Sequence, residues 1–172
     1  TCKKLGLALG TSDGRAGGLL SADKAAQRQG LRSLKKDLSA IARHGGHTYF
    51  CVLGPDDPSQ PRAATFEIFK NVYPKVVAHA EKVGVQIAIE PWPGPSPHGP
   101  NLGCSPESLR RIFEAIPSPN LGICYDPSHF ARLQIDHMRL LHEFSDRVRH
   151  VHLKDTEINE EKLYESGILG ES

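Results

Sequence analysis

Three side chains that can bind a divalent metal ion stand at the ends of segments with the composition of β-strands. Glu90 ends the segment 85–90, Asp126 ends the segment 121–126, and His152 lies near the end of the segment 147–154. Two carboxylates and an imidazole suit Mn²⁺, Mg²⁺, Co²⁺ or Zn²⁺ and leave positions open for substrate oxygens. We therefore predict that these three residues form most of a divalent-metal site.

Large aliphatic side chains alternate with smaller or polar ones in the same segments. Ile87 and Ile89 fall on one face of their strand, and Glu90 falls on the other face. Asp126 and His152 likewise fall opposite the aliphatic side chains of their own strands. In a barrel, alternate side chains of a strand face the surrounding helices or the interior. The three candidate ligands are therefore expected to point inward together.

Helix and strand signals alternate along the whole chain, which indicates parallel β/α units in one domain covering residues 1–172. The carboxyl ends of such strands meet at one rim, where α/β barrels carry their catalytic groups. Ser21 and Ser105 are predicted helix N-caps, and Pro74 is expected to kink or split the helix after the second strand. The five predicted strands are 5–10, 48–53, 85–90, 121–126 and 147–154.

The composition is that of a globular protein, with 38% hydrophobic and 24% charged residues. Lys and Arg number 21 against 20 Asp and Glu, which disfavours a nucleic acid or an anionic membrane as partner. No apolar run approaches the roughly 18 residues of a membrane span. The cysteines form no C-x-x-C pair, which favours neither a zinc knuckle nor a disulfide scaffold and suggests a reducing, cytoplasmic setting.

The motifs around the candidate ligands resemble those of the xylose isomerase-like barrel superfamily. They read IAIEPW at 87–92, GICYDPSHF at 122–130 and HVHLKD at 150–155, in that order and spacing. The group contains sugar phosphate isomerases and epimerases, ketose 3-epimerases, hydroxypyruvate isomerases, inosose dehydratases and apurinic-site endonucleases. The resemblance implies an α/β fold in which the chain supplies about five β/α units, strands three to seven, of a (β/α)8 TIM barrel.

Residue by residue, the resemblance implies that Glu90 is both a metal ligand and a catalytic acid or base, and that Asp126 and His152 are ligands. His129 would bind a substrate oxygen or a second metal. The family's fourth ligand, a glutamate on the eighth strand, has no counterpart before Ser172, and a complete barrel needs about 250 residues. We therefore expect a fragment of a longer protein, whose unpaired strand edges favour homo-oligomers or aggregation.

The implied activity is that of a divalent-metal-dependent isomerase or epimerase of a sugar or sugar phosphate, with Mn²⁺ as the most expected ion. A metal-stabilised enediolate would form when a carboxylate removes a proton from carbon. Three further residues are candidates for substrate contacts. Lys154 would hold an anionic or hydroxyl substituent, Trp92 would pack on a sugar face, and His98 would reach the substrate from the long loop 91–103.

Other interpretations stay open. His152 alone would be read as a hydrogen-bonded core histidine, and Asp126 before proline as a turn residue. His150, one inward position deeper, is expected to be an interior or supporting residue. The alternative enzymes are an inosose-type dehydratase and an apurinic-site endonuclease, although the latter needs a histidine where the chain has Cys51, Leu53 and Gly54. The non-enzyme alternative is a truncated, non-catalytic barrel piece.

Overall fold

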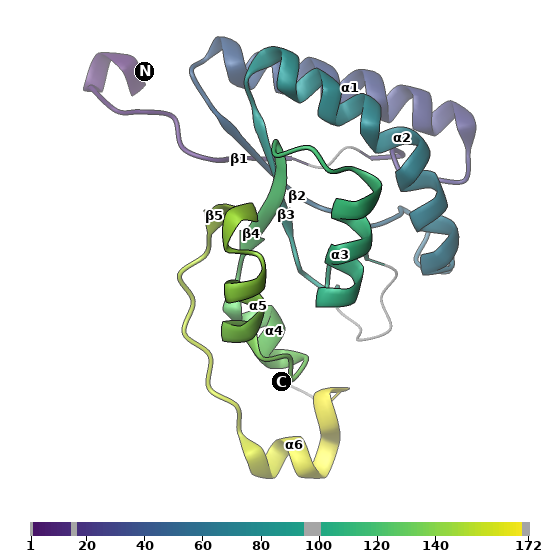
Figure 1. Ribbon diagram of the computed structural model, residues 1–172, viewed down its shortest axis with the longest axis vertical. Coiled ribbons are helices and arrows are strands. Elements are labelled where there is room, and N and C mark those ends of the chain that lie inside the picture. The colour runs from purple at the N-terminus through teal and green to yellow at the C-terminus, as the bar shows by residue number, and fades with distance from the viewer. Residues whose placement is uncertain (1, 15–16, 95–100, 170–172) are drawn as a thin grey trace.

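The computed structural model describes residues 2–14, 17–94 and 101–169 and contains a five-stranded parallel sheet. The strand order is β1-β2-β3-β4-β5, so that each strand pairs with the next one along the chain, as in one arc of an α/β barrel. Helices follow the strands, and α1, α2 and α3 lie on one side of the sheet (Figure 1). The strands are Ser12–Asp13, Thr48–Val52, Gln86–Glu90, Leu121–Tyr125 and Val148–Val151.

The helices confirm the expected alternation with the strands. They are α1 (Lys24–Arg43), α2 (Arg62–Val83), α3 (Pro106–Ala115), α4 (Pro127–Arg132), α5 (His137–Glu143) and α6 (Glu160–Ser166). Short 3-10 turns occupy Cys2–Leu5, Ser145–Arg147 and Gly167–Leu169. Among the described residues, no helix is both long enough and apolar enough to span a membrane.

The helix starts and stops follow capping chemistry, with two differences from the expectation. Ser105 caps α3 as predicted, since its hydroxyl accepts a hydrogen bond from the Ser108 N–H. The N-cap of α1 is Asp23 rather than Ser21, because the Asp23 carboxylate accepts from the Ala25 N–H at 2.7 Å. Pro74 does not split α2, which runs unbroken across it.

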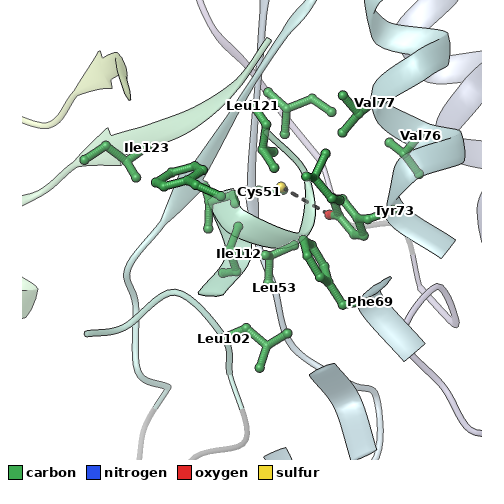
Figure 2. Packing of buried hydrophobic residues seen from close by; sticks show 14 of the residues in the cluster. Cys51, Leu53, Phe69, Tyr73, Val76, Val77, Leu102, Ile112, Leu121 and Ile123 are labelled. Carbon is green, nitrogen blue, oxygen red and sulfur yellow. Dashed lines mark hydrogen bonds between the residues drawn. The ribbon is translucent and has the colours of Figure 1, made fainter. Parts of the chain in front are cut away.

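The apolar core lies between the sheet and the helices. Phe69, Val76 and Ala80 of α2 are fully buried, as are Ile87 and Ile89 of β3. Figure 2 shows apolar side chains of the helices and strands packed together at this interface. Full burial of one such side chain stabilises a fold by about 1.5–3 kcal/mol. The predicted aliphatic face of β3 is thus the helix-facing one, and the opposite row, which ends in Glu90, faces away from the helices.

The predicted strand 5–10 is wrong. These residues make no ladder, and Leu7 is 58% exposed. The cause is the register, because Ser12 pairs with Tyr49 and Asp13 with Phe50. Residues before Thr11 therefore run past the start of β2 at Thr48 and have no strand beside them, and the segment extends away from the sheet (Figure 1).

The last strand is shorter than predicted and is irregular. Ile123 pairs with Val148, but Cys124 pairs with His150, so Arg149 is one extra residue in β5. This is a β-bulge. A side chain at Gly122 would collide with the Arg147 carbonyl, so the close approach of the two strands requires glycine there. Beyond β5 the chain runs extended to α6, which lies on the side of the sheet where β3 and β4 end (Figure 1).

Candidate metal centre

The parallel strands bring the three predicted ligands to one edge of the sheet. Glu90 is the last residue of β3, Asp126 follows β4, and His152 follows β5. Two hydrogen bonds fix the ends of β4 and β5. The His152 N–H donates to the Tyr125 carbonyl at 2.9 Å, and Asp126 caps α4 by accepting from the Ser128 N–H at 3.0 Å. Each ligand thus stands on backbone that is held by the strand pairing or by a helix cap.

Four donor atoms, one from each of four residues, converge at this edge. His152 Nδ1 lies 3.3 Å from Glu90 Oε1 and 3.2 Å from Asp126 Oδ2. His129 Nε2, from the first turn of α4, lies 3.3 Å from Glu90 Oε1 and 3.5 Å from Asp126 Oδ2. Two imidazoles therefore bracket two carboxylates, and the structure adds His129 to the predicted triad.

The distance of each imidazole nitrogen from the carboxylate oxygens fits binding of both groups to one ion. Donor atoms that lie ~2.1 Å from a common ion are ~3.0 Å apart at octahedral angles and ~3.4 Å apart at tetrahedral angles. The four nitrogen to oxygen distances, from 3.2 to 3.5 Å, fall close to this range. Oxygen and imidazole donors suit Mn²⁺ or Zn²⁺. The ligand atoms of Glu90, Asp126 and His129 all lie within 4.8 Å of one another, so these three residues are compatible with a divalent ion held between them. His152 lies within 3.3 Å of both carboxylates from the side of β5.

Asp126 is held as an anion. Burial acts to raise its pKa, but hydrogen bonds from Lys154 and Ser128, together with the nearby charges of His129 and Lys154, lower the pKa to about 2. The Lys154 Nζ lies 2.7 Å from Asp126 Oδ2. The same hydrogen bond raises the pKa of Lys154. The Asp126 carboxylate is thus ionised at any physiological pH and is available as a ligand.

The residues predicted to contact substrate differ in where the structure places them relative to this centre. Lys154 is joined to it through Asp126. Trp92 is partly buried and lines a cavity of about 320 Å³ with Asp56 and Asn101, and none of the four donor residues lines this cavity. His98 lies outside the described residues. His129 also lines a larger cavity, of about 750 Å³, that extends between α4 and α6.

Sequence reasoning missed two residues at the centre. The ring of Phe50, on the inward face of β2, lies edge-on to His152 with ring centroids 5.1 Å apart. The Ser128 hydroxyl donates to Asp126 Oδ1 at 2.6 Å. Alternation along β2 would have placed Phe50 inward, and the capping position would have indicated Ser128. His150 lies inside the barrel arc beside His152, with ring centroids 5.1 Å apart.

Comparison with known proteins identifies a family. The model of the xylose isomerase-like TIM barrel family matches residues 1–167. Mannonate dehydratase 2 of Agrobacterium fabrum (strain C58 / ATCC 33970) is 37% identical over 87 residues, which are 49% of this chain and 22% of that protein. The matched stretch therefore spans under a quarter of this relative.

Solved structures share the fold at low sequence identity. A D-tagatose 3-epimerase-like protein superposes with a TM-score of 0.73 at 19% identity, over 90% of this chain and 58% of that one. Mannonate dehydratase from Streptococcus suis serotype 2 superposes with a TM-score of 0.76 at 12% identity, over 87% of this chain and 56% of that one. The chain spans little more than half the length of these structures.

Proposed function

The chain belongs to the xylose isomerase-like TIM barrel family, and from this premise we propose that it carries the metal-binding edge of an isomerase or epimerase acting on a sugar or sugar phosphate. The observation that supports this most is the convergence of four donor atoms at the carboxyl ends of β3, β4 and β5. The residues that contribute them are Glu90, Asp126, His129 and His152.

Glu90, Asp126 and His152 are the proposed ligands, with Mn²⁺ as the preferred ion. When bound, a divalent ion polarises the substrate carbonyl and stabilises the negative charge that develops as the neighbouring carbon loses a proton. The ligands take different roles according to their surroundings. Asp126, with its pKa near 2, is too weak a base to remove a proton from carbon and serves to hold the ion.

Glu90 is the proposed base. Its residue is only 9% exposed, and its Oε1 contacts both His129 and His152 at 3.3 Å, which fixes the carboxylate at the mouth of the sheet. A carboxylate held in this way accepts the proton from the carbon, and returning it to the adjacent carbon completes an isomerisation. An epimerisation would need a second acid on the opposite face of the sugar, which the family's eighth-strand glutamate would supply. His129 Nε2, next to Glu90, is placed to donate a hydrogen bond to a substrate oxygen.

Two further contacts with the substrate are proposed. Lys154 is about half exposed and anchored to Asp126, so its ammonium can also reach an anionic or hydroxyl substituent at the rim. Trp92 would pack against a sugar face from its own cavity beyond the end of β3. In this proposal the substrate lies above β3 and β4, with the reacting carbon over Glu90.

A dehydratase is the second candidate function, favoured by the similarity to mannonate dehydratase 2 over about half of the chain. Loss of water from a hydroxy acid or hydroxy ketone also begins with removal of a proton next to a carbonyl or carboxylate. The two reactions differ in the next step, since the epimerase returns the proton to carbon and the dehydratase expels the neighbouring hydroxyl.

Solvent-deuterium exchange tests the proposal. The protein is incubated with Mn²⁺ and a panel of ketoses, ketose phosphates and aldonic acids in D₂O, and products are followed by NMR. An isomerase or epimerase puts deuterium on carbon without losing water, whereas a dehydratase releases water. Glu90→Gln should abolish exchange. Glu143→Gln is the matched control, because Glu143 pairs with Arg110 on the surface. Full exchange by Glu90→Gln contradicts the assignment of the base.

A further inference from the structure

A second group of donor atoms lies beside the carboxylate centre. Cys124, His150 and His152 each offer one ligand atom, and these three atoms lie within 4.8 Å of one another. Cys124 pairs with His150 across β4 and β5, and His152 stands two residues further along. Residues at this spacing lie on the same face of the sheet. The cluster thus faces the same interior as Glu90 and Asp126.

The chemistry of this cluster differs from that of the carboxylate centre. One sulfur and two imidazole nitrogens favour ions such as Zn²⁺, whereas carboxylate oxygens favour Mn²⁺ or Mg²⁺. Three protein ligands leave one position of a tetrahedral zinc ion open. The Cys124 thiol must lose its proton to solvent when it binds the ion.

A hydrogen bond orients one of the imidazoles for this role. His150 Nδ1 lies 3.0 Å from the Thr11 hydroxyl, which leaves Nε2 as the free ring nitrogen. Metal-binding histidines commonly hold their other ring nitrogen through such a bond, which fixes both the tautomer and the direction of the ring. Thr11 lies just before β1, so the contact joins the first and last strands of the sheet across the interior.

We propose that Cys124, His150 and His152 form a second metal site, which takes a thiolate-preferring divalent ion such as Zn²⁺ and shares His152 with the carboxylate centre. Because His152 Nδ1 also contacts Glu90 and Asp126, a zinc ion in the second site competes with the first site for this imidazole. The second site itself does not depend on the sugar chemistry proposed above.

Cys51 provides a matched control. It is buried like Cys124, but it belongs to the helix-facing side of β2. Figure 2 shows its thiol directed toward the Tyr73 hydroxyl among apolar side chains, with a sulfur to oxygen distance of 3.6 Å. Burial raises the pKa of the Cys51 thiol to about 12, with a smaller opposing effect from the hydrogen bond with Tyr73. No imidazole takes part in this contact, so a metal bound through sulfur should not involve Cys51.

Cobalt titration tests the site directly. Co²⁺ bound to a thiolate gives a sulfur-to-cobalt charge-transfer absorption that oxygen and imidazole ligands do not give. The wild-type chain and Cys51→Ser should both develop this absorption, and Cys124→Ser should lose it while it still binds Mn²⁺. Absence of the absorption in the wild type, or its persistence in Cys124→Ser, overturns the proposal.

A second measurement does not depend on any variant folding correctly. X-ray absorption at the zinc edge of the wild-type chain, loaded with one equivalent of Zn²⁺, should give one sulfur and at least two nitrogen neighbours. A shell with oxygen and nitrogen only overturns the site.

His150→Gln should weaken Zn²⁺ binding by tenfold or more and leave Mn²⁺ binding unchanged. Equal losses for the two ions would show one site rather than two.

Discussion

Replacing Asp126 by asparagine removes the charge of the carboxylate but keeps a side-chain oxygen that can cap α4, since asparagine is also a favoured N-cap. Although burial acts to raise the pKa of Asp126, the hydrogen bonds from Lys154 and Ser128 take it from 3.8 to about 2. This difference approaches two pKa units, and each unit corresponds to about 1.4 kcal/mol. The ionised carboxylate therefore contributes on the order of 2 kcal/mol to the free energy of unfolding.

The sign of the pH dependence follows from the direction of the shift. Because folding lowers the pKa of Asp126, its contribution is complete above about pH 4 and is lost as the pH falls toward about 2. Urea unfolding, followed by circular dichroism in metal-free buffer, measures this free energy at about pH 6 and about pH 2. Between these two values the wild type should lose about 2 kcal/mol more than Asp126→Asn.

Asp136→Asn is the matched control for this experiment. Asp136 caps α5 through the Arg139 N–H at 2.9 Å, but it is exposed to solvent. Its variant should keep the pH dependence of the wild type. If Asp126→Asn and the wild type lose equal free energy between the two pH values, the hydrogen bonds from Lys154 and Ser128 do not stabilise the ionised Asp126, and the reasoning is refuted.

Four further outcomes are expected. Glu90→Gln should lower the rate of deuterium exchange by about 10²–10⁴-fold, and loss of less than tenfold would remove Glu90 from the role of base. Mn²⁺ at about 100 times its dissociation constant should add about 2.7 kcal/mol to the free energy of unfolding, and EDTA should reverse this; an unchanged unfolding curve would contradict the site. Phe69→Ala should cost about 3–5 kcal/mol in urea unfolding, since Phe69 is fully buried, and a cost below about 1 kcal/mol would contradict its place in the core. Gly122→Ala should destabilise the pairing of β4 with β5, visible as faster amide exchange in β5, because the added methyl group meets the Arg147 carbonyl; unchanged exchange would contradict that packing.

Alternation and capping predicted the parts of the fold that depend on local chemistry. The pattern around Ile87 and Ile89 indicated the direction of Glu90, because a residue on a strand must face either the helices or the interior. Ser105 capped its helix as expected. At the start of α1, two residues with capping side chains, Ser21 and Asp23, stand close together, and composition does not decide between them.

Strand register was beyond what the sequence pattern could predict. The segment 5–10 has strand-like alternation, yet the pairing of Ser12 with Tyr49 leaves it without a neighbour. Likewise, the four-donor arrangement depends on α4 turning back so that His129 approaches Glu90 at 3.3 Å. Phe130, the next residue of α4, is fully buried and stacks on the ring of Tyr125, a tertiary contact that the sequence pattern does not reveal. A spacing of three residues from Asp126 indicates only that the approach is possible.

The extra residue in β5 has a consequence for how this sequence can vary. Val148, just before Arg149, pairs with Ile123 on the helix-facing side of β4. After Arg149, His150 pairs with Cys124, so His150 and His152 share the interior face with Cys124 and Asp126. In a regular ladder that kept Arg149, this residue would pair with Cys124, and His150 and His152 would then face the helices. Deleting Arg149 would instead leave Val148 beside Ile123 and His150 beside Cys124, so both imidazoles would keep their interior face. The bulge, rather than the identity of residue 149, therefore decides which face of the sheet the two imidazoles occupy.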